Sequence, residues 1–170
     1  MARIATVLLL LAISGLTVFA IACGGDDDEV AAKRPSIEPT VRTFYMEAIE
    51  PKGSTSAEDE PFPSEALPAG GGYKLEEPDE DGKWVVETYT WAPDQIVVYE
   101  GDTVNLEIVG INGASHDAKI EGFVDSFVVE RGKLTSLSFV ADKAGVFGII
   151  CHTHQPAMTG ELVVLPRPES

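Results

Sequence analysis

Four residues with metal-binding side chains of soft or intermediate character lie near the C-terminal end of this chain. Cys151, His154 and Met158 fall within eight residues, and His116 lies 35 residues upstream. A cysteine thiolate, two imidazoles and a weak methionine thioether form the ligand set of a mononuclear copper electron-transfer site. Magnesium and calcium prefer oxygen ligands, so this set favours copper over either of them.

The residue counts support a metal site. The chain of 170 residues has two cysteines, three histidines and three methionines. Cys23 has a separate use, described below, which leaves Cys151 without a disulfide partner, and a single thiol in an exported protein needs an explanation. The alternatives are a small buried hydrophobic residue and a nucleophilic or redox-active thiol. Neither alternative accounts for the two histidines and the methionine around it.

Residues 1–22 have the pattern of an export signal. Arg3 supplies a positive charge, residues 4–22 are uncharged and mostly apolar, and small residues precede Cys23. This end resembles the bacterial lipobox, whose cysteine is acylated and becomes the mature N-terminus, although Ala20 stands where leucine is usual. The alternative is an uncleaved membrane anchor, because 19 residues can just span a bilayer. Both place the remaining chain outside the cytoplasm, on the periplasmic or outer face of the cell membrane.

Residues 23–72 predict an acidic tether. Their low hydrophobicity, high charge and frequent proline and glycine are typical of segments that build no core. Residues 41–49 interrupt this pattern with aromatic and β-branched side chains, which indicate a strand or a docking segment. Whether this stretch joins the main sheet stays open at this point.

Residues 73–166 predict an all-β domain, followed by a short tail over residues 167–170. Turn-forming sequences separate short runs of β-forming residues, and there is almost no helical periodicity. Strands of this length and spacing favour a β-sandwich or barrel, and about 95 residues suffice for one core. The predicted strands cover residues 84–91, 95–100, 103–109, 116–120, 126–129, 133–140, 145–151 and 159–165.

The chain is acidic, with 28 Asp and Glu against 12 Lys and Arg and a formal net charge of −16. This charge argues against nucleic acid as a partner, because nucleic-acid binding proteins neutralise phosphates with basic residues. It also argues against electrostatic docking on anionic lipid. A solvated acidic surface is the simplest interpretation, and a basic protein partner is the alternative.

With the ligand set and the strand pattern together, residues 84–166 resemble the cupredoxin family, which includes plastocyanin, amicyanin and pseudoazurin. The likeness is carried by the approach to the cysteine, residues 141–147 (ADKAGVF), and by the exit, residues 158–164 (MTGELVV). The resemblance implies a Greek-key β-sandwich or barrel of the cupredoxin type. It also implies one copper ion per domain, with His116 from a loop at one end and the other three ligands between the last two strands.

Some positions depart from the family pattern. His152 is an extra imidazole beside Cys151. Adjacent residues of an extended chain point to opposite sides, so we expect His152 to face away from the metal, with ligation in place of His154 as the alternative. Asp117 follows His116 where the family often has asparagine, and we expect it to support the site through a backbone hydrogen bond.

The exit segment also resembles the binuclear copper domain of cytochrome oxidase subunit II and nitrous oxide reductase. That centre needs a second cysteine four residues before the first, and Phe147 stands there. The sequence therefore predicts a mononuclear site. The three residues between His154 and Met158 make a spacing intermediate between those of amicyanin and plastocyanin.

The sequence as a whole predicts a lipid-anchored, monomeric electron carrier that serves redox proteins, including membrane-bound ones, and that is not an enzyme. The alternative is a copper protein for acquisition or delivery, which would use the same ligands. A third interpretation is a protein-binding module without metal, which the intact ligand set disfavours. A hydrolase is disfavoured because no acid–base set accompanies the single thiol.

Overall fold

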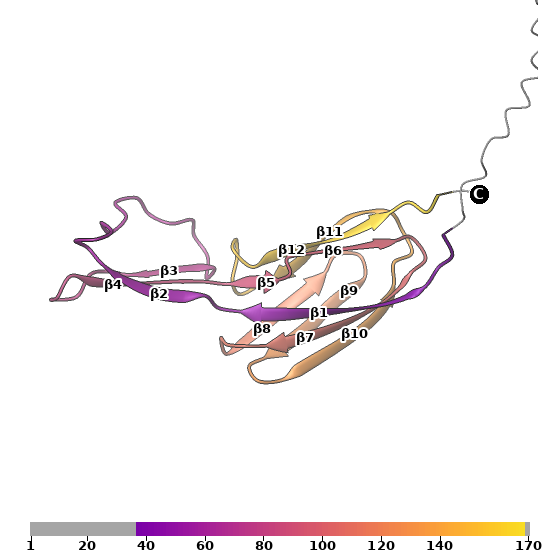
Figure 1. Ribbon diagram of the computed structural model, residues 1–170, viewed down its shortest axis with the longest axis horizontal. Coiled ribbons are helices and arrows are strands. Elements are labelled where there is room, and N and C mark those ends of the chain that lie inside the picture. Colours follow the sequence, from indigo (N-terminus) through magenta and orange to yellow (C-terminus); the bar gives the residue numbers. More distant parts are fainter. Residues whose placement is uncertain (1–36, 169–170) are drawn as a thin grey trace, which may run out of the picture. The chain divides into compact units, whose positions relative to one another are not determined.

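Twelve β-strands and no helix make up residues 37–168, the part of the chain that the computed structural model describes (Figure 1). The expected export signal over residues 1–22 and the expected acylation site Cys23 lie outside the described residues. Between residues 37 and 168, no helix is long and apolar enough to cross a membrane. The all-β class predicted from the strand pattern is confirmed.

The first sheet of the sandwich has four strands in the order β10-β7-β1-β5. β7 (Thr103–Gly110) pairs antiparallel with β10 (Leu134–Val140) and parallel with β1 (Val41–Ile49). β1 pairs on its other side with β5 (Thr90–Ala92), in antiparallel orientation. Side chains alternate between the faces of a strand, so one face of β7 is apolar and fully buried: it carries Val104, Leu106 and Ile108.

The second sheet holds the strands that lead to the candidate ligands, in the order β6-β12-β11-β8-β9. β11 and β12 cover the same residues as the strands predicted at 145–151 and 159–165. β12 pairs parallel with β6 and antiparallel with β11, and β8 lies between β11 and β9. The bounds are β6 (Gln95–Tyr99), β8 (Ser115–Ile120), β9 (Val124–Glu130), β11 (Gly145–Cys151) and β12 (Thr159–Leu165).

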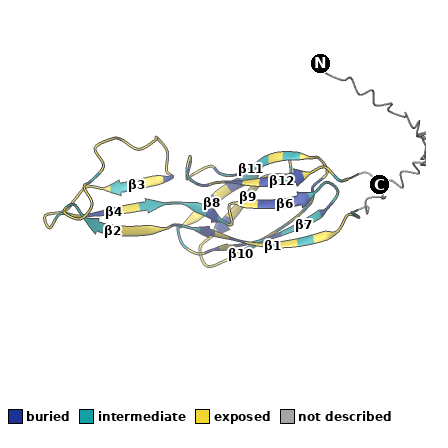
Figure 2. Cartoon of the chain, turned by 45° about the horizontal axis from the view of Figure 1, so that its top comes forward, coloured by how far each residue is buried: buried dark blue, intermediate teal, exposed yellow. Residues whose placement is uncertain are grey.

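The inward faces of these two sheets form one hydrophobic core (Figure 2). Trp91 of β5 is 1% exposed and donates its indole N–H to the carbonyl of Ile149 on β11 at 3.1 Å, which ties the two sheets together. Each fully buried large aliphatic side chain contributes about 1.5–3 kcal/mol to the free energy of folding. Cys151 and Met158 belong to this core, so the candidate site is built into the sandwich interior.

A third sheet, β2-β4-β3, lies in the chain between β1 and β5. β4 (Lys83–Thr88) pairs antiparallel with both β2 (Lys52–Ser56) and β3 (Tyr73–Glu76). We call residues 51–88, which contain these strands and their connecting loops, the arm. Figure 1 shows the arm continuing from the end of the sandwich where β1 passes into β2 and β4 passes into β5.

The arm has a small apolar cluster of its own. Trp84 is 7% exposed and meets Phe62 edge-on, with 5.5 Å between the ring centroids. Its indole N–H donates to the carbonyl of Glu60 at 2.9 Å. These contacts hold the loop before β3 against β4.

The folded unit begins upstream of residue 73, where the sequence predicted the start of the domain. Residues 41–49 form β1 of the sandwich, and residues 37–72 of the predicted tether belong to the folded unit. The physical reason is burial: Met46 and Ala48 of β1 enter the core, where they are 1% and 0% exposed. The alternative left open for residues 41–49 is therefore decided in favour of a strand of the main sheet.

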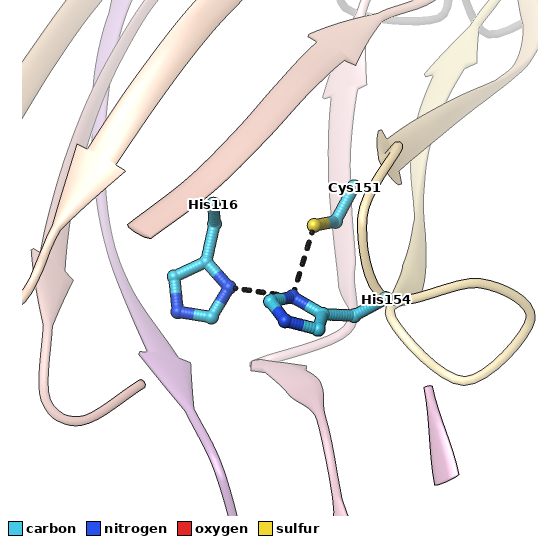
Figure 3. Close-up of side chains that lie close together, drawn as sticks. All are labelled: His116, Cys151 and His154. Carbon is cyan, nitrogen blue, oxygen red and sulfur yellow. Dashed lines mark hydrogen bonds between the residues drawn. The ribbon is translucent and has the colours of Figure 1, made fainter. Parts of the chain in front are cut away.

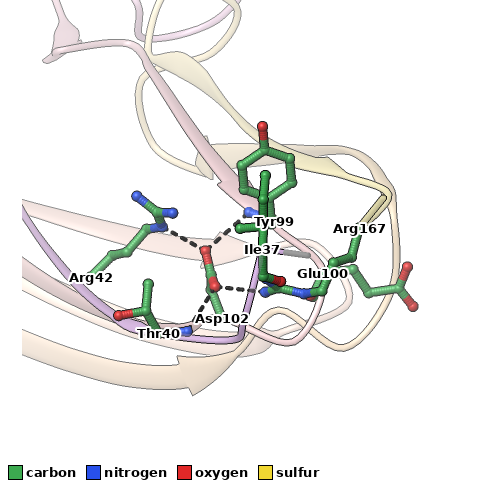
Figure 4. Close-up of polar contacts among 7 residues, drawn as sticks. All are labelled: Ile37, Thr40, Arg42, Tyr99, Glu100, Asp102 and Arg167. Carbon is green, nitrogen blue, oxygen red and sulfur yellow. Dashed lines mark hydrogen bonds and ion pairs between the residues drawn. The ribbon is translucent and has the colours of Figure 1, made fainter. Parts of the chain in front are cut away.

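Asp102, in the turn between β6 and β7, connects both ends of the folded unit (Figure 4). Its fully buried carboxylate accepts hydrogen bonds from the side chains of Arg42 and Arg167 and from the backbone N–H groups of Thr40 and Tyr99. Burial alone would raise the pKa of Asp102, but these donors hold it well below its usual value. Arg167, expected in the tail, is instead fixed to the sandwich.

Candidate metal centre

Three metal-binding side chains converge in the interior of the sandwich (Figure 3). One nitrogen or sulfur atom from each of His116, Cys151 and His154 lies within 4.8 Å of the others. The Nδ1 atoms of the two histidines are 3.2 Å apart, and the Cys151 Sγ is 3.4 Å from the His154 Nδ1. The structure thus brings together three of the four ligands expected from the sequence.

The strands explain why His116 and Cys151 meet. β8 and β11 are hydrogen-bonded neighbours, and Cys151 stands opposite Ala118 in their register. His116, two residues before Ala118, points to the same inward face because side chains alternate along a strand. Both side chains are completely buried. Two ligands are therefore placed by paired strands rather than by free loops.

The loop between β11 and β12, which we call the ligand loop, carries the candidate ligands His154 and Met158. Hydrogen bonds close it into a compact turn. The N–H of Cys151 donates to the carbonyl of Met158 at 3.1 Å, and the N–H of Met158 donates to the carbonyl of His154 at 2.9 Å. The Gln155 side chain donates to the carbonyls of Cys151 and Met158 at 2.8 and 3.1 Å. Met158, the last residue of this loop, is completely buried, and its assignment as the weak fourth ligand stays a prediction.

His152 and Asp117 lie on the opposite side from the cluster. Both side chains are exposed, whereas His154 is only 9% exposed. The backbone N–H of His152 donates to the carbonyl of Asp117 at 2.8 Å and ties the ligand loop to β8. The contribution of Asp117 to the site thus comes from its main chain, and its carboxylate is directed to solvent.

Burial governs the electrostatics of the cluster. It lowers the pKa of His116 and of His154, and the charge of His116 lowers that of His154 further. It raises the pKa of the Cys151 thiol. The two imidazoles therefore stay neutral and keep a lone pair for a metal ion, while the thiol must lose its proton when a metal binds.

The hydrogen bonds show that the cluster fits a metal ion. The His116 Nε2 lies 3.2 Å from the carbonyl oxygen of Asn112. A carbonyl oxygen only accepts, so Nε2 carries the proton and Nδ1 keeps its lone pair. That lone pair and the Cys151 sulfur both face the His154 Nδ1, where one proton can serve only one of them. A soft metal ion could accept a lone pair from each of the three ligand atoms at once. Two imidazole nitrogens and a thiolate sulfur suit copper.

Sequence reasoning missed three residues around the cluster. The Tyr89 ring stacks on the His154 ring, with 3.7 Å between centroids and an 8° angle between planes. Its hydroxyl donates to Glu50 at 2.6 Å, and Asn112 contacts both Glu50 and His116. Tyr89 lies inside the predicted strand over residues 84–91, and Glu50 lies in the predicted tether over residues 23–72. Only the pairing of β1 with β5 brings them together.

No protein-family model matches this chain, and no curated protein matches it. Among solved structures, it is similar to copper nitrite reductase from Nitrosomonas europaea, with a TM-score of 0.50 and 16% identity over 76% of this chain and 45% of that one. Cu-containing nitrite reductase from Thermus scotoductus SA-01 has a TM-score of 0.48 and 22% identity, over 76% of this chain and 28% of that one.

A third similar structure is auracyanin A, a blue copper protein from Chloroflexus aurantiacus. Its TM-score is 0.39 and its identity 17%, over 45% of this chain and 89% of that one. The chain spans less than half the length of each of the two nitrite reductases. At these identities the likeness concerns the fold alone. The fold is a cupredoxin-type β-sandwich, as the resemblance of residues 84–166 predicted.

Proposed function

We propose that this chain is a mononuclear type 1 copper protein that carries single electrons between redox partners. The observation that carries the proposal is the convergence of His116, Cys151 and His154 inside a cupredoxin-type sandwich, with ligand atoms within 4.8 Å of one another. These three residues would hold one copper ion together with Met158, whose thioether would be the weakest of the four ligands. When bound, copper would supply the one-electron couple that the proposed function needs.

The frame around the ligands suits electron transfer. His116 and Cys151 come from hydrogen-bonded strands, and the turn from Cys151 to Met158 is closed by backbone hydrogen bonds. Ligands held in this way keep their positions when the charge at the centre changes. Burial also excludes water from the ligand atoms, so little solvent rearranges with each electron.

Copper acquisition or delivery remains the second candidate, because the same ligands would serve it. A delivery site must hand its metal to the ligands of a partner and therefore needs accessible ligand atoms. Here Cys151 and His116 are fully buried and His154 is 9% exposed. Burial of all three favours a resident metal ion over an exchangeable one, and therefore favours a carrier of electrons over a carrier of copper.

We further propose that the protein works outside the cytoplasm, anchored by acylation of Cys23. Seventeen residues separate Cys23 from the first residue of β1, Val41. A chain of that length spans at most about 60 Å. This limit keeps the sandwich close to the bilayer and favours membrane-bound redox partners.

Copper titration of the purified full-length chain tests the proposed function. We expect one copper ion per chain and, in the oxidised state, a strong visible absorption from the thiolate–copper bond. Cys151→Ser should abolish this absorption while the far-ultraviolet circular dichroism stays that of the folded sandwich. An oxidised wild-type chain that is colourless at full copper loading would reject the electron-transfer site. Rapid loss of copper to a chelator would then support delivery.

A further inference from the structure

A tyrosine covers the candidate ligand His154. Tyr89 is the single residue between β4 and β5, at the point where the arm joins the sandwich. Its half-buried ring lies parallel to the imidazole of His154 at 3.7 Å and meets His116 edge-on at 6.1 Å. The stack places an aromatic surface directly over the one imidazole of the cluster that is not fully buried.

A buried carboxylate holds the tyrosine in place. The Tyr89 hydroxyl donates to Glu50 Oε1 at 2.6 Å, and Glu50 is 6% exposed. Burial by itself would raise the pKa of Glu50, but the hydrogen bonds from Tyr89 and Lys52 lower it, so the group is a carboxylate. Burial and this carboxylate raise the pKa of Tyr89 to about 12, so the phenol keeps its proton and remains the donor.

The same glutamate is tied to the other imidazole. Its backbone N–H donates to Asn112 Oδ1 at 2.7 Å, and its carbonyl accepts from Asn112 Nδ2 at 2.8 Å. The carbonyl of Asn112 in turn accepts from His116 Nε2 at 3.2 Å. A continuous set of contacts therefore runs from one imidazole to the other through Tyr89, Glu50 and Asn112.

The arm closes the other side of the ligand loop. The N–H of Gly72 donates to the carbonyl of Gln155 at 3.0 Å, and Thr88 Oγ1 donates to the carbonyl of Gly72 at 3.3 Å. The loop lies so close that a Cβ at Gly71 would stand 2.4 Å from the carbonyl oxygen of Thr153. Gly71 and Gly72, before β3, and Tyr89, after β4, thus enclose His154 between them.

We propose that Tyr89 and Glu50 are positioning residues of the copper site: the glutamate orients the tyrosine, and the tyrosine fixes the ring plane of His154 and keeps water from one face of that ring. This inference rests on the proposed function. A residue that merely filled the junction of arm and sandwich would need neither a parallel stack on a ligand nor a buried carboxylate for its hydroxyl. The stack constrains rotation of the imidazole, and loss of such outer contacts costs about 10- to 100-fold in metal affinity.

Variants of the full-length chain distinguish the effect of the Tyr89 ring on copper binding from the effect of its hydroxyl group. Tyr89→Leu removes the stack, Tyr89→Phe keeps the stack but loses the hydrogen bond, and Glu50→Ala removes the acceptor. We expect copper affinity at least 10-fold weaker in Tyr89→Leu than in the wild type. On addition of azide, a new absorption band should appear in Tyr89→Leu and should be absent in the wild type. Tyr89→Phe and Glu50→Ala should each show a smaller but measurable loss, because the ring remains and only the hydrogen bond that orients it is removed. Tyr45→Leu is the control, because Tyr45 is 75% exposed on β1.

A double-mutant cycle tests whether the glutamate acts through the tyrosine. In Tyr89→Phe and Glu50→Ala the same hydrogen bond is lost, so the double variant should lose no more copper affinity than the worse single variant. In the metal-free chain, deuterium exchange at the imidazole C2 of His154 should be several-fold faster in Tyr89→Leu than in the wild type. This readout needs no copper and reports access to the ring directly.

The outcomes distinguish this inference from the function on which it rests. A folded Tyr89→Leu chain with wild-type copper affinity, azide response and C2 exchange would overturn the positioning role and leave the copper site intact. Additive losses in the cycle would overturn the role of Glu50. A wild-type chain that takes up no copper would overturn both proposals, even if the C2 exchange showed that Tyr89 shields His154.

Discussion

His152 and His154 are separated by one residue, but the fold gives them different surroundings. His154 lies in the buried cluster with Cys151, whereas the side chain of His152 is exposed. We predict that His152→Ala leaves the visible spectrum of the copper-loaded chain unchanged. His154→Ala should alter the spectrum and open a space that added imidazole fills, with partial recovery of the absorption. Spectra with and without imidazole measure both effects, and the reverse pattern would show that His152 is the ligand.

Met158 offers a second test at the level of one side chain. Met158→Leu conserves the volume of a fully buried residue, so the free energy of unfolding should change by less than about 1.5 kcal/mol. A weak axial ligand tunes the reduction potential more than it holds the metal. We therefore expect copper to be retained and the potential to rise, as measured by a spectroelectrochemical titration. Complete loss of copper would instead identify Met158 as a primary ligand.

The ligands could be predicted from the sequence because few residue types bind copper and the chain has few of them. Three histidines and two cysteines leave little choice, and the loop from Cys151 to Met158 is contiguous. Tyr89 and Glu50 could not be predicted in the same way. Both are common residue types, 39 positions apart, and their contact depends on how β1 enters the sheet.

At the level of elements, the prediction succeeded where strands are sequence neighbours. β11 and β12 match their predicted bounds because an antiparallel pair with a short connection shows its full pattern locally. β1 pairs in parallel with β7, which begins 62 positions later, and proline, glycine and acidic residues fill much of the space between. Composition in such a segment favours disorder. Only burial of Met46 and Ala48 in the core reveals that it belongs to the fold.

The arm approaches the ligand loop so closely that even the methyl group of an alanine at Gly72 should destabilise the fold. At Gly72, an added Cβ would stand 2.6 Å from the carbonyl oxygen of His154 and 2.7 Å from the backbone nitrogen of Ala157. Gly72→Ala should therefore lower the free energy of unfolding by about 1–3 kcal/mol, the usual effect of overpacking. It should also disturb the copper spectrum. Denaturant unfolding and absorption measure the two effects.

Gly53 provides the matched control for that substitution. It lies in β2 of the same arm, and an added Cβ there would meet nothing within 4 Å. Gly53→Ala should leave both the free energy of unfolding and the spectrum near those of the wild type. Equal behaviour of the two alanine variants would show that the arm does not press on the ligand loop.

At the scale of the whole molecule, Asp102 links the two ends of the folded unit and makes its stability depend on pH. The pKa of this carboxyl is lowered in the folded state, so its contribution is complete above the unfolded value of about 3.9. The contribution is lost as the pH falls further, through the lower folded value. Asp102→Asn should lower the free energy of unfolding by about 2 kcal/mol at pH 7, since charged hydrogen bonds are lost.

Denaturant unfolding at a series of pH values checks this prediction. The difference between wild type and Asp102→Asn should be constant from pH 7 to 5 and shrink below about pH 4, where the Asp102 carboxyl of the unfolded wild-type chain begins to bind a proton. Asp125→Asn is the control, because Asp125 is an exposed aspartate of β9. A difference that persists unchanged at low pH would show that the charge of Asp102 is not what stabilises the two ends.

The two cysteines predict separable properties of the whole protein. Cys151 is buried in the sandwich, and Cys23 follows the apolar signal-like segment, so acylation and copper binding should depend on different thiols. Two acyl chains anchor a protein stably where a single chain binds marginally. In a bacterial host, Cys23→Ser should lose labelled palmitate and leave the membrane fraction while still giving the copper absorption, and Cys151→Ser should do the reverse. A Cys23→Ser chain that stays in the membrane fraction without palmitate would instead show that residues 4–22 remain as an uncleaved anchor.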